Sequence, residues 1–411
     1  MTSLTRNPVV TVLPMEECQA NLAVFFQLER EILRHESAWL AAVPYWDAKQ
    51  KIGEHVLEDA HHAESLLKRL HELKTAAEHK QIRGVEVLLR EFASAASGDE
   101  WLHGLYCVLK PWLAGQFRAY LDYSDALMDA PTHQVIQRIL VELEAQCRWF
   151  TGYQPQYSTW EQADVEPWLH YLRLLTGGTV VRDGSLSGLV EQLPNRPAGH
   201  PDFTVFENVR RDRTFNVVAK RDAKREDGEG YEDKRYAVFY NHIQEMQFAE
   251  SLGLTLFQTS EMPWAYHHDL ARHLADEVRH ASMGQARLEQ LGRRLTELPM
   301  MTQHYHFRAN LDPVERFCLM TLVMEASSFE HKRSNIQLYE SKGDATSVRY
   351  AVYDLHDELL HTNLGHVWVP ILLRVYHDAR SVQEVVEHCR GLISQVATEY
   401  LSKEALKRLK K

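Results

Sequence analysis

Apolar residues recur at helical spacing through the first third of the chain. Between residues 17 and 150 they stand three and four positions apart, a spacing that predicts amphipathic helices. The run 18–43 keeps this pattern for roughly seven turns, and Pro44 is expected to end the helix. Pro111 predicts a break or kink in a later helix, whereas Pro131 suits the first turn of another. A group of packed helices is therefore expected here.

The pattern changes between residues 153 and 235. Segments such as LPNRPAGHPDFTVFENV and AKRDAKREDGEGYEDKR are rich in glycine, proline and charge, a composition that is typical of loops. The sequence therefore predicts an irregular connector that wraps the surface or covers a site. This connector separates a helical domain at 1–152 from a second helical domain at 236–411.

The second domain is predicted to hold four long helices and a C-terminal helix. Their expected ranges are 236–259, 263–295, 313–342, 344–369 and 381–410. Gly343 fits the left-handed position that follows a helix, and Asp344 fits the N-cap of the next one. Pro370 is expected to interrupt the fourth helix.

Composition narrows the class of protein. The apolar fraction of 45% and the charged fraction of 25% are those of an ordinary globular protein. A net charge of −11 argues against a nucleic-acid partner, because phosphate binding normally requires a basic face. The five cysteines are widely spaced without a CxxC pair, which predicts reduced thiols in the cytoplasm. No apolar run reaches membrane-spanning length, so no membrane partner is expected.

Two copies of one short motif stand on the second and fourth helices of the second domain. They are DEVRH at 276–280 and DELLH at 357–361, so each reads Asp-Glu-x-x-His. A glutamate and a histidine three positions apart lie on the same face of a helix and can bind one metal ion. One such motif is weak evidence, since both residue types are common on helices. Two copies on separate helices are much stronger evidence for a metal site.

The helix before each motif carries two glutamates five positions apart. Glu245 and Glu250 precede the first motif, and Glu325 and Glu330 precede the second. Residues five apart point about 140° away from each other, so only one of each pair can face the motif. Glu325 lies in an apolar run, whereas Glu330 is followed by basic residues. We therefore predict Glu245 and Glu325 as ligands and keep Glu250 and Glu330 as alternatives.

This arrangement matches the ligand pattern of carboxylate-bridged dimetal sites. Such sites take one glutamate from each of two helices and Glu-x-x-His from each of two others. The six predicted ligands are Glu245, Glu277, His280, Glu325, Glu358 and His361. Asp276 and Asp357 are predicted to hold the second ring nitrogen of the metal-bound histidines, with plain exposed acids as the alternative. His366 is a further candidate ligand, or else a surface or core residue.

These motifs resemble those of the ferritin-like di-iron carboxylate superfamily. Between residues 195 and 368 the chain is similar to a ferritin-like family related to the tRNA-modifying di-iron hydroxylases. The resemblance implies an all-α fold, with a metal-binding four-helix bundle and a C-terminal helix at 236–411. It also implies two iron ions bridged by carboxylates, with a Mn/Fe pair as the alternative, and oxygen activation that draws on an external electron donor.

The first domain repeats part of the motif pattern. Residues 53–70 align with the first motif helix at an offset of 218, which pairs His55 with His273, Asp59 with Glu277, and His62 with His280. Residues 101–121 contain no acid that could act as a third-helix glutamate, and the following helix lacks Glu-x-x-His. Residues 1–152 are therefore predicted to form a degenerate ferritin-like bundle, in tandem with the metal-binding one. Glu31, Asp59 and His62 remain as the alternative of a mononuclear site.

The leading functional prediction is an oxygen-activating non-haem di-iron oxygenase or oxidase. It would act on a small molecule together with O2, by hydroxylation, N-oxygenation or a related oxidation, and the degenerate bundle would help folding, dimerisation or substrate entry. The alternatives are a ferroxidase or metal-storage protein, and a metal-poor scaffold. The length of 411 residues and the long connector count against storage, because storage cages use compact single bundles.

Overall fold

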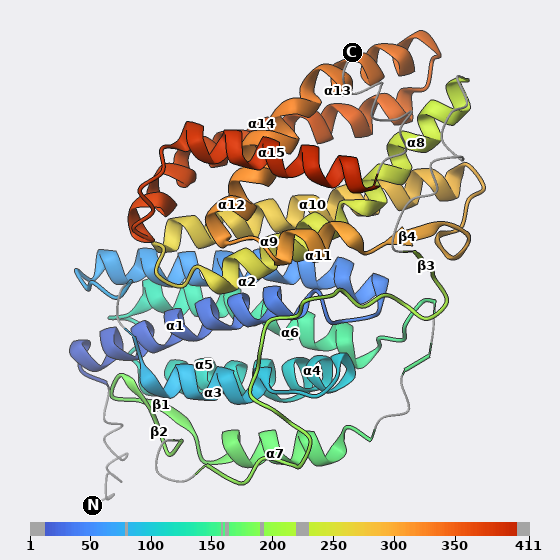
Figure 1. The fold of residues 1–411 in the computed structure, drawn as a ribbon. Helices are drawn as coiled ribbons and strands as arrows, with labels where there is room; N and C mark the ends of the chain where they lie inside the picture. The colour runs from blue at the N-terminus through green and yellow to red at the C-terminus, as the bar shows by residue number, and fades with distance from the viewer. Residues whose placement is uncertain are drawn as a thin grey trace, which may run out of the picture. The chain divides into compact units, whose positions relative to one another are not determined.

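The protein was analysed as a computed structural model that describes residues 13–78, 81–157, 159–160, 164–189, 193–218 and 230–400, with side chains described up to residue 394. The described chain is mostly helical, with four short strands (Figure 1). The predicted all-α class is confirmed to the extent that the described chain is mostly helical. Contacts divide the chain into two units. Unit 1 contains residues 1–35, 58–154 and 159–204, and unit 2 contains residues 36–57, 155–158 and 205–411.

This division differs from the predicted boundaries at residues 152 and 235. Helix α1 (Met15–Trp39) gives its last residues to unit 2, and helix α2 (Trp46–Glu72) gives its first residues to unit 2. A boundary drawn where composition changes cannot detect this, because each of these helices contributes packing residues to both units.

Unit 1 contains most of the helices expected in the first third of the chain. After α1 and α2 these are α3 (Arg83–Ala93), α4 (Gly98–Gly104), the π-helical segment η1 (Leu105–Leu109), α5 (Lys110–Tyr123) and α6 (Ala130–Thr151). Pro131 lies in the first turn of α6, as predicted. At Pro111 the helix does not break. The wider π turn comes directly before α5 and accommodates a residue that lacks a backbone N–H.

The predicted irregular connector contains regular structure in unit 1. Helix α7 (Glu166–Gly177) buries Trp168 and Leu172, and a hairpin follows from β1 (Val180–Arg182) and β2 (Ser185–Ser187). Asp183 and Gly184 both have positive φ, which suits the tight turn of a two-residue hairpin. The prediction of little regular structure is therefore wrong at 166–187, while residues 161–163, 190–192 and 219–229 lie outside the described chain.

Unit 2 contains the helices of the predicted second domain. They are α8 (Tyr231–Gln244), α9 (Met246–Gln258), α10 (Trp264–Gln290), α11 (Gln303–Ala309), α12 (Pro313–Cys318), the π-helical segment η4 (Leu319–Glu325), α13 (Ala326–Ser341), α14 (Ala345–Val375) and α15 (Val382–Tyr400). A 3-10 turn, η3 (Leu295–Glu297), precedes β4 (Pro299–Met301), which pairs in parallel with β3 (Asn216–Val218). Helix α10 packs against α8, α9 and α14, and α13 and α14 lie side by side (Figure 1).

Several predicted helix ends in unit 2 are confirmed and others are not. Gly343 has a φ of 68°, and the Asp344 side chain accepts a hydrogen bond from Ser347 N, so both capping predictions are confirmed. The expected single helix at 236–259 is broken at Glu245 into α8 and α9. The predicted interruption at Pro370 is wrong, since α14 continues to Val375. The final helix is described as far as Tyr400.

Two glycines let the motif helices approach their neighbours closely. A Cβ atom added to Gly284 on α10 would lie 2.7 Å from His242 Cβ on α8. A Cβ atom added to Gly365 on α14 would lie 2.7 Å from Thr321 Cβ on η4. Because these distances are shorter than van der Waals contact, alanine at either position would push the helices apart. The glycines therefore bring each motif helix onto a helix that carries one of the predicted glutamate ligands.

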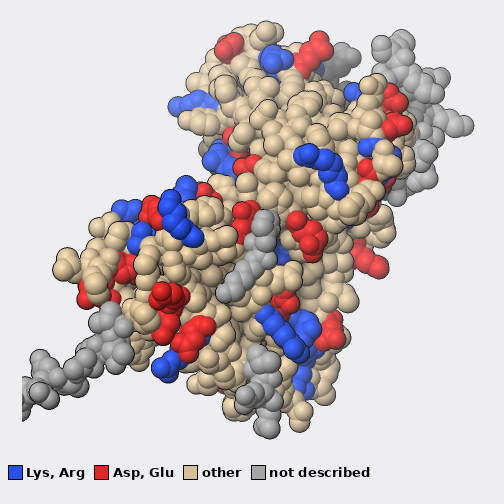
Figure 2. Space-filling model, turned by 90° about the vertical axis from the view of Figure 1, so that its left-hand side faces the viewer, with Lys and Arg blue, Asp and Glu red and all other residues tan. Residues whose placement is uncertain are grey.

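The described helices lack the character of membrane spans. Within the described ranges, every helix is too short or too polar to cross a bilayer. Figure 2 shows one face of the surface, where lysine and arginine side chains lie interspersed with aspartate and glutamate.

Candidate metal centre

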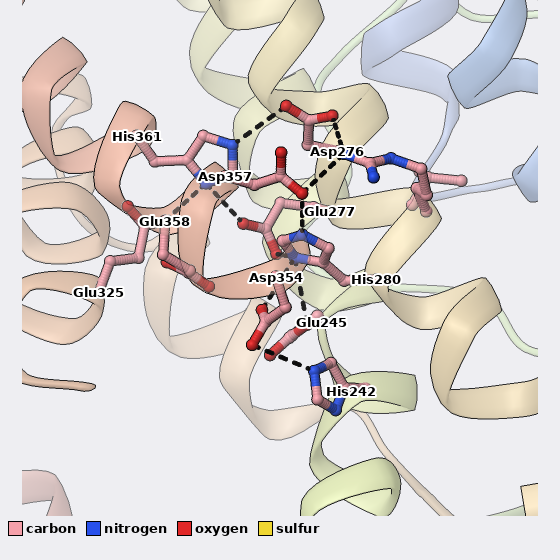
Figure 3. A network of polar contacts seen from close by, with 12 residues as sticks. His242, Glu245, Asp276, Glu277, His280, Glu325, Asp354, Asp357, Glu358 and His361 are labelled. Carbon is pink, nitrogen blue, oxygen red and sulfur yellow. Dashed lines mark hydrogen bonds and ion pairs between the residues drawn. The ribbon is translucent and has the colours of Figure 1, made fainter. Parts of the chain in front are cut away.

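All six predicted ligands lie together inside unit 2 (Figure 3). They come from four helical segments: Glu245 from the junction of α8 and α9, Glu277 and His280 from α10, Glu325 from the end of η4, and Glu358 and His361 from α14. Five of them are at most 4% exposed, and the Glu245 side chain is 19% exposed. The cluster is therefore shielded from bulk water.

Glu277 lies at the centre of the cluster. Two groups of side chains, each with ligand atoms within 4.8 Å of one another, have only this residue in common. One group adds His273, Glu325 and His361, and the other adds Glu245 and His280. His280 also forms a group with Asp354 and Glu358. A carboxylate shared by two groups of this kind can bridge two metal ions.

Each motif aspartate contacts the histidine of the other motif. Asp357 Oδ2 lies 3.1 Å from His280 Nε2, and Asp276 Oδ2 lies 3.4 Å from His361 Nε2. These contacts leave the Nδ1 atoms directed at the carboxylates, with His280 Nδ1 3.5 Å from Glu245 Oε2 and His361 Nδ1 3.4 Å from Glu277 Oε1. Each imidazole is thus oriented to offer Nδ1 to a cation.

Arginine side chains keep these aspartates in place. Arg279 donates to Asp276 Oδ1 over 2.6 Å and to Asp357 Oδ2 over 2.7 Å, and Arg272 Nε donates to Asp276 Oδ2 over 2.8 Å. Burial raises the pKa of Asp276, but hydrogen bonds from His361, Arg272 and Arg279 outweigh burial and hold that pKa well below its usual range. Both aspartates are buried, so the alternative of plain exposed acids is wrong.

Many polar atoms of the cluster lack a hydrogen-bond partner. Among the described residues these atoms are both carboxylate oxygens of Glu277, the Oε2 atoms of Glu245, Glu325 and Glu358, and the Nδ1 atoms of His273, His280 and His361. Unpaired buried polar groups are costly and rare. The Nδ1 atoms of His280 and His361 face carboxylates, whereas His273 faces them through Nε2. Carboxylate oxygens and imidazole nitrogens that face one another are the donors that iron and manganese accept. The residues therefore fit a pair of such ions.

The pKa values of two members reflect the surplus of carboxylates in the cluster. Burial opposes a positive charge on His273, but Glu325 and Glu277 outweigh burial and raise the pKa of His273 to about 10. Burial raises the pKa of Glu358 well above its usual range. Both shifts favour proton uptake, so the cluster attracts positive charge.

Three residues of the cluster were not predicted as ligands. His273 and Asp354 each stand four positions before a motif glutamate, which places them on the same face of the helix. That shared spacing is the signal that could have found them. His242 Nε2 lies 3.5 Å from Asp354 Oδ2 and had no signal in the sequence. The Lys332 ammonium donates to both oxygens of Asp354 over 2.6 and 2.7 Å.

The alternative ligands lie outside the cluster. Glu250 is buried and pairs with Lys49 over 2.5 Å and with Arg211 over 2.5 and 2.9 Å. Glu330 and His366 are exposed on α13 and α14. The choice of Glu245 and Glu325 over Glu250 and Glu330 therefore agrees with the packing, and metal binding itself stays a prediction.

A smaller cluster lies inside unit 1, with one change from the predicted residues. Its members are Glu29, Asp59 and His62, so the prediction of Glu31 as a member is wrong. Glu31 pairs instead with Arg34 over 2.7 Å and with Arg30 over 3.0 Å. Burial raises the pKa of Glu31, but these arginines outweigh it and lower the pKa to about 2. Residues two apart on a helix point in nearly opposite directions, so only Glu29 can face α2.

Comparison with known protein families adds one finding. The family described as "Protein of unknown function (DUF455)" matches residues 187–406, more than half of the 411-residue chain. The chain belongs to this family. The matched region of this DUF455 member contains every residue of the unit 2 cluster and stops short of the unit 1 cluster. Comparison with curated proteins and with solved structures gives no match.

Proposed function

We propose that unit 2 holds a pair of iron ions and that the protein is an oxygen-activating oxidase or oxygenase of a small molecule. The observation that carries the proposal is the position of Glu277, which is shared by two groups of buried carboxylates and imidazoles. A Mn/Fe pair would use the same donors.

The cluster divides naturally into two halves around Glu277. One ion would be held by Glu325 and His361 with His273 beside them, and the other by Glu245 and His280 with Glu358 beside them. When bound, the metal pair would exchange two electrons with dioxygen, and an external donor would return those electrons. Carboxylate ligands suit this chemistry because they can move between bridging and terminal positions.

The protein's own residues orient these ligands. Asp276 and Asp357 hold the Nε2 sides of the two imidazoles, and Arg279 holds both aspartates. Lys332 donates to Glu358 Oε1 over 3.1 Å, which positions that carboxylate toward the cluster. Mutation of residues that hydrogen-bond to metal ligands typically lowers metal affinity or activity by about 10- to 100-fold.

A groove between η4 and α15 is large enough for a small substrate. Its volume is about 540 Å³, which lies in the usual range for small-molecule sites. Leu322, Val323 and Ala326 line it from η4 and the start of α13, on the face of the helix turned away from Glu325, and Arg390 and Ile393 line it from α15. The lining is mainly apolar with one guanidinium group. It therefore favours a substrate with an apolar body and an acidic or polar end.

We also propose that the two units are tandem ferritin-like bundles, with the one in unit 1 degenerate. In both units the cluster takes residues from two helices that precede a π-helical segment. That segment is η1 before Lys110 in unit 1, and η4, which ends at Glu325, in unit 2. π-Helical turns are rare and occur mostly at functional sites, so their matching positions support a common architecture.

Metal analysis of ligand variants tests the proposed function. The full-length protein would be stripped of metal, loaded anaerobically with Fe(II), and compared with Glu277→Ala and with the exposed control Glu330→Ala. We expect Glu277→Ala to hold two fewer iron ions per chain, because the Glu277 carboxylate serves both halves, and Glu330→Ala to match the wild type.

Oxygen consumption separates an oxygenase from a storage protein. The wild type, once reduced, should consume oxygen faster when a substrate is present. Unchanged iron content in both Glu277→Ala and His280→Ala would refute the metal centre, and many irons per chain under air would indicate storage.

A further inference from the structure

The unit 1 cluster is built from fully buried side chains. Glu29 lies on α1, and Asp59 and His62 lie on α2. Their exposed fractions are 0%, 0% and 2%, and each offers one ligand atom within 4.8 Å of the others. Charged groups at this depth are stable only when they are paired or bind a metal ion. The question is therefore what balances the two carboxylates.

The His62 ring is oriented as a ligand would be. Its Nε2 atom lies 3.0 Å from Glu142 Oε2, so the ring is held from the outer side by a carboxylate. Its Nδ1 atom lies 3.5 Å from Glu29 Oε1 and 3.8 Å from Asp59 Oδ1. A metal-bound histidine usually donates its other ring N–H to a carboxylate. His62 has this arrangement, with Nε2 at a carboxylate and Nδ1 directed toward Glu29 and Asp59.

Three atoms that face one another in this cluster lack hydrogen-bond partners. Within the described chain they are both carboxylate oxygens of Glu29 and the Nδ1 atom of His62. A hydrogen bond between Glu29 and His62 would satisfy only two of these atoms, and the 3.5 Å contact between them does not meet hydrogen-bond geometry. A cation between the three side chains would use all of these atoms.

Lys110 limits the cluster to one ion. Its ammonium lies 2.9 Å from Asp59 Oδ2 and 2.6 Å from Gln146 Oε1, and Gln146 Nε2 donates to Asp59 Oδ1 over 3.0 Å. A fixed positive charge on one side of Asp59 repels a second ion there. Asp59 Oδ1, which lies 3.8 Å from His62 Nδ1, accepts from Gln146 and keeps a second lone pair for an ion.

The local charge also favours one divalent ion. Glu29, Asp59, Glu58 and Glu142 place four carboxylates at the cluster, whereas Lys110 supplies one positive charge. When His62 is neutral, as a metal ligand must be, a divalent ion offsets part of the remaining negative charge. Two carboxylates and one imidazole suit Mn(II), Fe(II) or Zn(II).

From these observations we propose that unit 1 binds one divalent transition-metal ion through Glu29, Asp59 and His62. The ion joins α1 to α2 inside the unit, and its burial makes its role structural. The proposal concerns unit 1 alone and stands on its own residues, independently of the chemistry proposed for unit 2.

Manganese binding to the full-length protein tests this proposal. Three metal-stripped proteins would be titrated with Mn(II) and followed by electron paramagnetic resonance. They are the wild type, the double variant Glu277→Ala/His280→Ala, and this double variant with His62→Gln added. We expect the double variant to keep one ion per chain with the spectrum of an isolated Mn(II). Adding His62→Gln should weaken that binding by more than about 100-fold, since even partners outside the ligand shell contribute about 10- to 100-fold. His61→Gln, an exposed neighbour, is the matched control and should change nothing.

Two further measurements keep the outcome decisive. Glu29→Gln has nearly the same shape as the wild-type side chain, so it replaces His62→Gln if that variant fails to fold by circular dichroism. Anomalous scattering from Mn-loaded crystals should place an ion between Glu29, Asp59 and His62. The proposal is overturned if the double variant binds no Mn(II), or if the ion persists unchanged in His62→Gln and Glu29→Gln. Either result leaves the iron content of unit 2, measured with Glu277→Ala, unaffected.

Discussion

The clusters of unit 1 and unit 2 share one half and differ in the other. In each, the histidine Nδ1 lies 3.5 Å from a glutamate of the preceding helix, as seen for His62 with Glu29 and for His280 with Glu245. The Nε2 atom of the same ring lies 3.0 Å from Glu142 in unit 1 and 3.1 Å from Asp357 in unit 2. The two proposals therefore assign one ion to this half in both units.

The other half differs by charge. In unit 2 it contains Glu325 and His361, which offer a carboxylate and an imidazole nitrogen. In unit 1 Lys110 and Gln146 contact Asp59 instead. A lysine ammonium can neutralise a buried carboxylate as a metal ion does, but it cannot change valence. If both proposals hold, a few side chains separate a buried cluster that binds two redox-active ions from one that binds a single structural ion.

Converting unit 2 to the unit 1 pattern should have the largest effect. In Glu325→Lys/His361→Gln, a lysine would replace one carboxylate ligand and a glutamine one imidazole. We expect one iron fewer per chain and a fall in reductant-dependent oxygen consumption of more than about 100-fold. Loss of a residue that only hydrogen-bonds to a metal ligand already costs about 10- to 100-fold, and loss of two ligands should cost more. Iron analysis and an oxygen electrode measure both. Glu330→Lys/His366→Gln, at exposed positions of α13 and α14, is the control, and equal losses in the control would contradict the comparison.

The reverse conversion of unit 1 should add a metal ion. Lys110→Glu/Gln146→His removes the ammonium and supplies a carboxylate and an imidazole in its place. We expect a second Mn(II) per chain in unit 1, seen as broadening of the isolated-ion spectrum by coupling between two ions. The single variant Lys110→Met removes the charge without adding a ligand and should bind no second ion. A double variant that is folded but still holds a single ion would show that backbone geometry, and not charge, separates the units.

Removal of the carboxylate behind each histidine tests the shared half. Asp357→Asn in unit 2 and Glu142→Gln in unit 1 keep the size of the side chain but weaken its hold on the imidazole. Both should weaken metal binding by about 10- to 100-fold, measured by competition with a chelator. A loss in one unit only would indicate that the matching distances do not reflect matching roles.

The number of protons released when metal binds should give the smallest difference between the two clusters. Burial opposes a charge on His62, but Glu29 and Glu142 raise its pKa to about 10, and the pKa of His273 is also about 10. These imidazoles are protonated at pH 7 without metal, so metal binding must release protons and must weaken as the pH falls. The pKa of His280 is raised as well, so unit 2 should release more protons than unit 1. Calorimetry in two buffers of different ionisation enthalpy measures this, and equal release from both units would contradict it.

Much of the unit 2 cluster could be predicted from helix geometry alone. The spacing of Glu277 and His280, repeated 81 residues later at Glu358 and His361, places each pair on one helix face whatever the tertiary packing. The apolar surroundings of Glu325 identify it as the inward member of its pair. The caps at Gly343 and Asp344 could be predicted for the same reason, because they depend only on neighbouring residues.

The remaining features depend on which helices pack together, and local periodicity does not contain that information. Asp276 and Asp357 each reach the histidine of the opposite helix, and Lys110 reaches Asp59 across 51 positions of sequence. Glu29 and Glu31 have the same chemistry, and only the packing of α1 on α2 turns Glu29 inward. The sequence by itself determined which residue types share a helix face. The tertiary structure alone decided which faces meet, because contacts between distant helices arise from side-chain packing that no short stretch encodes.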